Sequence, residues 1–471
     1  MSIWSRIVNV LRSDRLNREI DEELQSHIEE AIEQGRDPAE VRRAFGSHIR
    51  MREQSRDVKM APWFDSLRAD LIFGWRQLRK QRTASAASIL SLALAIGAAT
   101  AAFRLVDAVL LRPLPVAEPD RLFYVATTFV DREGRPDYRD DFDYPTYRRY
   151  RELIKDRAEP MVVGAINSRQ EVRFNGPDAE RLRRQYVSGN VFPSFGLKPA
   201  LGRLLAPSDD VTPGGHPVAV LGYDYWKSPF ARDPGVVGRT FQMGKYRFEI
   251  VGVAPRGFIG TEPGQIVDVF IPASMNAEAL ESPGWSWFRM WVRLSPGVSP
   301  EQVRQPLEAV YVQLLRDGVK NFASATPREV IERHLNQKLV LLSAASGASD
   351  LQKEYQRPLL ILGLLVALVL LIACANVANL MTAQAAARSR EMALRVSIGA
   401  GRARLIQLVL MECAMLAAFA SALGSVFAVW SAPVVVSMLR MPEDPVRLVL
   451  ETGWRELAFS FALALLVTLL F

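Results

Sequence analysis

Cysteine and histidine are scarce in this sequence. Its 471 residues include two cysteines and four histidines. Cys374 and Cys413 both lie within apolar stretches, so we expect neither a disulfide framework nor a cysteine-rich metal site. The histidines lack the spacing of metal ligands: His27, His48, His216 and His334. We therefore predict that the chain binds no metal and no other cofactor.

Motifs for nucleotide binding and catalysis are missing as well. The lone pair Gly244-Lys245 is followed by Tyr246 and does not form a Walker A motif. No nucleophile elbow surrounds Ser188. We therefore predict that the chain is not an enzyme, and that any nucleotide energy must come from a separate protein.

Long apolar runs are abundant instead. About twenty residues in a helix cross the ~30 Å hydrocarbon layer of a membrane. We predict four spans, within residues 84–111, 359–378, 408–430 and 454–471. The first is rich in Ala, Ser and Gly, which allow close helix packing in lipid. The last stops without a basic anchor, so we expect the chain to be incomplete at this end.

One charged pair lies in the first run. Arg104 and Asp107 are spaced i,i+3 and are expected to pair at the far membrane interface. A buried charged pathway through the membrane is the alternative.

The charge distribution predicts the orientation of the chain. The formal net charge is +7, and the arginines gather beside the apolar runs. The positive-inside rule explains this placement, so we predict no nucleic-acid partner. The segment before residue 84 and the short loop 384–405 then lie in the cytoplasm, and residues 112–357 lie outside. The lipid bilayer itself is thus a partner of this multi-pass membrane protein.

Residues 1–83 are polar, contain no secretory signal and are predicted to form a helical cytoplasmic region. Asp37 to Glu40 have the pattern of a helix start. This region is either a small solvated helical hairpin or a docking module for a cytoplasmic partner. Residues 68–82, with five basic residues and Asp70, predict an amphipathic helix on the membrane surface. An apolar stripe recurs every four residues earlier in the region: Leu16, Ile20, Leu24, Ile28 and Ile32.

Residues 112–357 have the turn chemistry of an inserted α+β domain, long enough to bury a core. We predict a hairpin over 239–253 and a helix opened by a capping box at Ser299 to Gln302. The inner face of that helix is predicted to carry Val303, Leu307 and Leu314. Further strands are predicted at 218–221, 291–294 and 338–342, and an Asn-Gly turn at 175–176.

Four aspartates precede a predicted helix over 145–154. They lack the Gly and Glu positions of an EF-hand loop, so we interpret them as a solvated turn rather than as a calcium site. These aspartates are Asp137, Asp140, Asp141 and Asp143.

The basic loop between the second and third spans has more apolar surface than topology requires. Glu391 and Arg395 stand i,i+4 in the favourable order, and Arg388 shares their helix face. Gly399 and Gly401 are expected to end the helix. Its remaining surface is apolar, which is typical of a helix that docks into a groove: Met392, Leu394, Val396 and Ile398.

Several motifs, in this order, resemble one family. They are Asn17 to Gly46, Ala108-Val-Leu-Leu-Arg-Pro-Leu-Pro115, Val187 to Phe192, Gly196 to Arg203, Val237 to Thr240, Cys374-Ala-Asn-Val-Ala-Asn-Leu380 and Arg388 to Arg402. The chain resembles an ABC transporter permease of the MacB/FtsX/LolC type, and within it the duplicated orphan permeases (ADOP). The similarity extends over nearly the whole sequence.

The resemblance implies a domain organisation in the cell inner membrane. Residues 1–83 would be the cytoplasmic N-terminal region and 84–111 the first span. Residues 112–357 would be a MacB-like periplasmic core domain. Residues 358–471 would be an FtsX-like permease domain, with spans two to four and a coupling helix at about 388–404.

The resemblance also implies partners. Such permeases work with a separate ABC ATPase subunit and with a second permease unit, and the family allows a periplasmic partner. By that resemblance the ATPase contact includes Arg388, Arg390, Glu391, Met392, Leu394, Arg395 and Gly399. The chain departs from the family at Arg104, where a small polar residue is usual, and it lacks the second repeat.

These observations predict a permease subunit that couples ATP hydrolysis by a separate cytoplasmic ATPase to motion of the extracytoplasmic domain, by mechanotransmission or transport. The alternative is a membrane-anchored extracytoplasmic receptor or scaffold that signals through the N-terminal helices.

Overall fold

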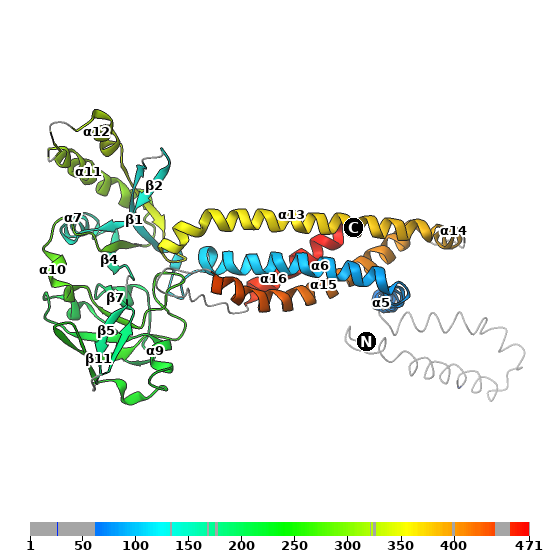
Figure 1. Cartoon of the computed structure of the whole chain (residues 1–471), viewed down its shortest axis with the longest axis horizontal. Coiled ribbons are helices and arrows are strands. Elements are labelled where there is room, and N and C mark those ends of the chain that lie inside the picture. The colour runs from blue at the N-terminus through cyan, green and yellow to red at the C-terminus, as the bar shows by residue number, and fades with distance from the viewer. Residues whose placement is uncertain are drawn as a thin grey trace, which may run out of the picture. The chain divides into compact units, whose positions relative to one another are not determined.

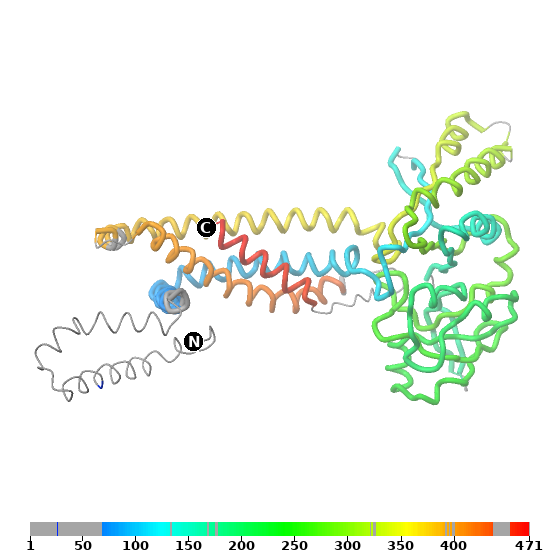
Figure 2. The backbone as a smooth tube through the Cα atoms, turned by 180° about the vertical axis from the view of Figure 1, so that it is seen from behind, coloured from blue at the N-terminus to red at the C-terminus, as the bar shows by residue number. Residues whose placement is uncertain are grey.

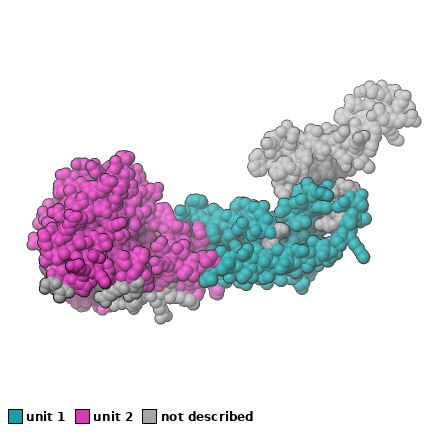
Figure 3. Space-filling view, turned by 90° about the horizontal axis from the view of Figure 1, so that it is seen from above, with its two compact units in different colours: residues 1–100, 365–429, 452–471 teal, residues 101–364, 430–451 magenta. Residues whose placement is uncertain are grey.

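A computed structural model describes Ser26 and residues 62–131, 134–166, 169–174, 178–320, 322–323, 326–397, 401–438 and 453–470. The helices predicted within residues 1–61 lie outside this part of the chain, apart from Ser26. The chain divides into two compact units (Figure 3). The first includes residues up to Thr100, Leu365–Val429 and Thr452–Phe471, and the second includes Ala101–Leu364 and Trp430–Glu451.

Helices make up the described part of the first unit. Portions of α6, α13, α15 and α16 run side by side (Figures 1 and 2). Their shared core contains small and branched side chains, among them Leu92, Ile96, Cys374, Ala420 and Val467. The helices are α5 (Pro62–Lys80), α6 (Arg82–Val106), α13 (Asp350–Ala387), α14 (Ser389–Ser397), α15 (Arg402–Met438) and α16 (Trp454–Leu470).

Three helices in the described part of the chain are long and apolar enough to cross a membrane. They are Arg82–Leu111, Asp350–Ala387 and Arg402–Val436. Helix α16 is also apolar and has 17 residues, so the total of four membrane passes stays a prediction.

The third apolar helix extends beyond the predicted span 408–430, because α15 continues through Pro433 to Met438. A proline removes one backbone hydrogen bond from a helix, and membrane helices tolerate this loss because other groups satisfy the freed carbonyl.

Two glycines bring α6 and α15 into close contact. A Cβ atom added at Gly97 would lie 2.9 Å from the carbonyl oxygen of Gly424 and 2.8 Å from a ring carbon of Phe427. A Cβ atom at Gly424 would lie 2.9 Å from the carbonyl oxygen of Ala93. Small residues therefore permit this backbone approach, as the composition of the first span predicts.

We expect Gly97→Leu to destabilise the helical unit by about 1–3 kcal/mol, because the added side chain must push α15 away. The midpoint of thermal unfolding, followed by circular dichroism of the full chain in detergent, measures the effect. The matched control is Gly363→Leu in α13, where nothing lies within 4 Å of an added Cβ atom. Equal melting of both variants would contradict the close approach.

The second unit contains a mixed β-sheet with short helices. Within the described residues the strand order is β14-β1-β13-β4-β7-β12-β9-β11-β10-β5-β6, with β2, β3 and β8 off this path. The pairs β7/β12 and β9/β11 are parallel. The strands are β1 (Leu122–Val130), β2 (Pro136–Arg139), β3 (Asp141–Phe142), β4 (Ala158–Gly164), β5 (Gln170–Arg173), β6 (Ala179–Leu182), β7 (Arg184–Val187), β8 (Leu201–Gly202), β9 (Val218–Leu221), β10 (Thr240–Met243), β11 (Tyr246–Val253), β12 (Val269–Pro272), β13 (Phe288–Leu294) and β14 (Lys338–Ser343).

Helices cover one part of this sheet. Figure 1 shows α7 and α11 near β1 and β4. Tyr150 of α7 and Leu307 of α11 share a core with Met290 and Val292 of β13. The α-helices are α7 (Tyr144–Ile154), α8 (Val191–Ser194), α9 (Tyr223–Lys227), α10 (Ala277–Leu280), α11 (Pro300–Val319) and α12 (Arg328–Leu335). Shorter helical turns are η1 (Asp107–Leu111), η2 (Pro119–Arg121), η3 (Pro207–Asp210), η4 (Pro234–Val236) and η5 (Ala273–Met275).

Several local predictions are confirmed in this α+β unit. Strands β10 and β11 form the expected hairpin. Ser299 caps α11 as predicted: its hydroxyl accepts a hydrogen bond from the Gln302 backbone amide, and the Gln302 side chain accepts one from the Ser299 backbone amide. The inner face of α11 differs by one residue, because Leu315 rather than Leu314 is buried. The Asn-Gly turn lies outside the described residues.

The four aspartates do not form a solvated turn. Residues 136–139 and 141–142 are strands β2 and β3, each paired within the sheet. Asp143 caps α7 by accepting a hydrogen bond from the Thr146 amide at 2.7 Å. Asp137 and Asp140 bind cations from distant segments. Our interpretation was wrong because those partners lie far away in the sequence.

Candidate coupling site

The loop predicted to contact an ATPase folds as a short helix between two long ones. Figure 2 follows the chain along α13, through α14 and back along α15. Leu394 and Val396 on α14 expose 62% and 54% of their surface. Such exposure on a short helix leaves apolar area available to a partner.

The structure describes some of the predicted contact residues and leaves others outside its described part. Arg388 directly precedes α14, and Gly399 lies outside the described residues. Side-chain positions of Glu391, Met392 and Arg395 are also outside the described part, so the Glu391–Arg395 pair stays a prediction. Five of the residues lie on α14: Arg390, Glu391, Met392, Leu394 and Arg395.

An ion pair between a buried carboxylate and a half-exposed arginine links α5 to the start of α15. Asp70 of α5 is 1% exposed. Its carboxylate accepts hydrogen bonds from both terminal nitrogens of Arg404, at 2.7 and 2.5 Å, and from Gln407 at 3.0 Å. A bidentate pair of this kind fixes orientation as well as distance.

The residue that follows the end of α13 contacts both α15 and α5. Arg388 lies 3.4 Å from the Glu412 carboxylate of α15. With the Gln77 amide turned so that its oxygen faces Arg388, that oxygen accepts from the guanidinium and lies 2.8 Å from Nε. Asp70 and Gln77 are seven residues apart, so they share one face of α5. Helix α5 thus contacts residues on both sides of α14.

Further contacts pack α5 against α15. A Cβ atom at Gly74 would lie 2.7 Å from the sulfur of Met415, and the rings of Trp75 and Phe419 have centroids 5.8 Å apart. The sequence predicts the amphipathic character of α5 but not these contacts between α5 and α15. The signal available was Asp70, the single acidic residue in a basic segment.

A second cluster of charges lies in the other unit, at the first turn of α13. Arg289 of β13 is 4% exposed. Its guanidinium binds Asp140 at 2.7 Å, Glu262 at 2.8 Å and Asp350, the first residue of α13, at 2.7 Å. One buried cation therefore joins the sheet to the start of a predicted membrane span.

Two more side chains strengthen this joint. Lys353 of α13 pairs with Asp137 at 2.9 Å and donates to the Tyr138 carbonyl oxygen. The Lys353 ammonium lowers the pKa of Asp137 through its hydrogen bond. The Gln352 amide donates to the Val109 carbonyl oxygen at 2.8 Å, at the end of the first apolar helix.

Glu262 is the unusual member of the Arg289 cluster. Burial raises the pKa of Glu262 to about 7, although Arg289 and the Ile166 amide favour its ionised form. The three carboxylates in turn raise the pKa of Arg289, although burial opposes this. The guanidinium therefore stays charged, while Glu262 titrates near neutral pH.

The described residues contain no group of three or more His, Cys, Asp or Glu side chains able to hold a metal ion. Both clusters link the start of a long helix to another element through several charge-assisted hydrogen bonds.

Two family models match this chain. The MacB-like periplasmic core domain matches residues 85–310, and the FtsX-like permease C-terminal domain matches residues 363–471. The chain is an ABC transporter permease of the MacB/FtsX type. Neither matched model describes an ATP-binding domain, and both describe components of membrane permeases.

Curated relatives of this permease are longer proteins. It is 24% identical over 307 residues to the macrolide export ATP-binding/permease protein MacB of Salmonella typhi, and 24% identical over 306 residues to that of Escherichia coli (strain K12). Each match covers 64% of this chain and 43% of the relative. The permease therefore spans less than half the length of the curated relatives it matches.

Two solved structures show similarity over about half of this permease. One is a domain of a permease protein from Porphyromonas gingivalis, with 16% identity, a TM-score of 0.34, and coverage of 48% of this chain and 91% of that chain. Another is the periplasmic region of MacB from Actinobacillus actinomycetemcomitans, with 17% identity, a TM-score of 0.33, and coverage of 50% and 92%.

Proposed function

We propose that this permease couples ATP hydrolysis by a separate cytoplasmic ATPase to motion of its extracytoplasmic domain. The observation that carries the proposal is the exposed apolar surface of α14, with both flanking segments held by α5. Because α5 holds the segments on both sides of α14, a partner that pushes on α14 would also move the ends of α13 and α15. A second permease unit would complete the assembly in the cell inner membrane.

The path from α14 to the outer domain runs through α13 in this proposal. The same helix ends directly before α14 and begins at Asp350, which Arg289 binds. Ion pairs at its first turn would transmit its movement to β13 and β2. The proposed orientation, with residues 1–83 and α14 in the cytoplasm and residues 112–357 outside, rests on the arginine distribution.

We expect the double substitution Leu394→Asp and Val396→Asp to reduce co-purification of the ATPase with the tagged, detergent-solubilised chain by about tenfold or more. Two carboxylates in an apolar interface must be desolvated without partners. Mass spectrometry of the co-purified proteins identifies ABC ATPase peptides and measures their amount. Charge reversal at Glu391 and Arg395 together should act in the same direction.

The matched control is Leu335→Asp on α12, since Leu335 is also an exposed leucine, with 41% of its surface accessible. It should leave co-purification unchanged. Undiminished ATPase recovery with both the α14 double variant and the charge reversals would overturn the assignment of this helix.

A further inference from the structure

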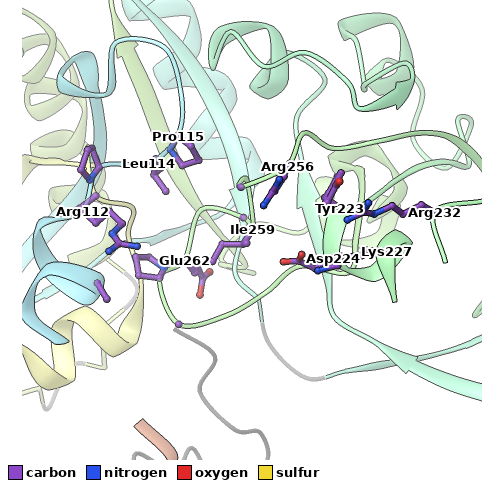
Figure 4. Close-up of a pocket in the computed structure, with 17 residues that line it drawn as sticks. Arg112, Leu114, Pro115, Tyr223, Asp224, Lys227, Arg232, Arg256, Ile259 and Glu262 are labelled. Atoms are coloured by element: carbon purple, nitrogen blue, oxygen red, sulfur yellow. The ribbon is translucent and has the colours of Figure 1, made fainter. Parts of the chain in front are cut away.

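A pocket of about 580 Å³ lies in the second unit, within the range of ligand-binding pockets. Four parts of the chain that are far apart in the sequence form it: residues 108–115, α9 with the turn that follows it, residues 256–264, and Ser346. Figure 4 shows Arg112, Leu114 and Glu262 in one part of the pocket, and Tyr223, Asp224, Lys227 and Arg232 in another. Of the charged groups described above, Glu262 lines this pocket while its carboxylate is bound to Arg289.

Uncompensated positive charge faces the pocket. Lys227, Arg232 and Arg256 are exposed, and none of them has a carboxylate partner in the described part of the chain. The pocket lining includes two acidic residues, Asp224 and Glu262. The negative charge of Glu262 is already paired with Arg289, which leaves Asp224 as the acidic lining residue without a cation partner in the described part of the chain. Arg112 is paired with Asp107 at 3.3 Å. The pocket therefore favours a ligand with negative charge.

The backbone that presents Arg232 is held in an unfavourable conformation. Ala231 and Arg232 have φ angles of 47° and 64°, in the left-handed region that non-glycine residues rarely adopt. The Arg232 amide donates to the Trp226 carbonyl oxygen at 3.2 Å, and the Trp226 indole donates to the Asp233 carbonyl oxygen at 2.9 Å. Strain of this kind persists where the surrounding structure enforces it, and it often marks functional sites.

Another part of the lining is apolar and continues from a membrane span. Leu114, Pro115 and Ile259 line the pocket. Arg112 follows Leu111, the last residue of the apolar helix that begins at Arg82. An amphipathic ligand that reaches this pocket from the membrane would thus contact cations with its charged headgroup and apolar side chains with the carbon atoms next to that headgroup.

We infer that this pocket binds the phosphate headgroup of an anionic membrane lipid, with Lys227, Arg232 and Arg256 contacting the phosphate. The inference does not depend on the proposed coupling to an ATPase. Lipid binding here would place a ligand beside Glu262, and so next to the Arg289 cluster at the start of α13.

The test uses the full chain in a neutral detergent, titrated with phosphatidylglycerol in mixed micelles and followed by native mass spectrometry. The triple variant K227Q/R232Q/R256Q should bind phosphatidylglycerol about a hundredfold more weakly, because each cation near an anionic headgroup contributes about a fivefold gain. The single variant Arg256→Gln should lose about fivefold. It removes a side chain that has no carboxylate partner among the described residues. Phosphatidylcholine should bind far more weakly than phosphatidylglycerol to the unaltered chain.

The matched control is R148Q/R149Q/R247Q, which removes three exposed cations outside the pocket. It should bind phosphatidylglycerol like the unaltered chain. Equal losses in the two triple variants, or equal binding of phosphatidylcholine, would overturn the inference. Competition by glycerol phosphate as effective as that by the lipid would also overturn it, since the site would then take a free phosphate.

Discussion

Replacing Arg404 by alanine is expected to destabilise the helical unit by about 1–3 kcal/mol and to abolish ATPase co-purification. The substitution removes two hydrogen bonds from Asp70 and leaves that carboxylate buried beside Gln407 alone. The loss comes from Asp70, which is 1% exposed, because its charge keeps the desolvation penalty after its cationic partner is removed. Without this pair, α5 no longer fixes the start of α15 next to α14.

Thermal unfolding of the full chain in detergent and ATPase co-purification together measure this effect. The matched control is Arg402→Ala, two residues earlier, whose side chain is exposed. Exchange of the two charges, Asp70→Arg with Arg404→Asp, should restore part of both properties. If Arg404→Ala and Arg402→Ala gave the same melting temperature and the same ATPase recovery, the Asp70–Arg404 pair would have no role in stability or coupling.

Replacing Arg289 by methionine should cause the largest destabilisation of the α+β unit, lowering its free energy of unfolding by about 3–5 kcal/mol. Three carboxylates would lose their common partner, and Glu262 among them is 3% exposed. The start of α13 would also lose its bond to β13. Thermal unfolding followed by tryptophan fluorescence measures the loss, since Trp291 is buried in the same strand.

The same cluster predicts a pH dependence. Glu262 has a pKa of about 7 in the folded chain against an ordinary value of 4.5. Its folded form binds the proton more tightly, so its contribution to stability is complete below pH 4.5 and is lost as the pH rises through 7. Glu262→Gln should remove this dependence, because the amide does not titrate.

Two variants separate the causes. Arg247→Met removes an exposed arginine from β11 and should leave the melting temperature unchanged. Adding Glu262→Gln to Arg289→Met should recover part of the lost stability, since no buried carboxylate remains at that position. A single variant Arg289→Met that melts like Arg247→Met would contradict the role of this cluster.

The sequence alone determined features whose physical causes are local. The capping box at Ser299 depends on hydrogen bonds between residues three apart, and the hairpin over 240–253 depends on a turn between adjacent strands. Glycine at position 244 adopts a φ of +56°, as that turn requires. Apolar length likewise predicted the long helices, and the basic helical segment around residues 388–404 includes α14.

Only the tertiary structure decided which charged residues work together. Asp70 and Arg404 are 334 residues apart, and Arg289 lies 149 residues from Asp140. Asp70 stands out as the single acidic residue of a basic segment, but nothing local identifies its partner or the partner of Asp140. The sequence therefore suggested a membrane-surface segment and a solvated turn at these places. The physical reason is burial, because a charge that is removed from water needs an opposite charge or a hydrogen-bond partner. Only the folded chain brings these partners within hydrogen-bonding distance.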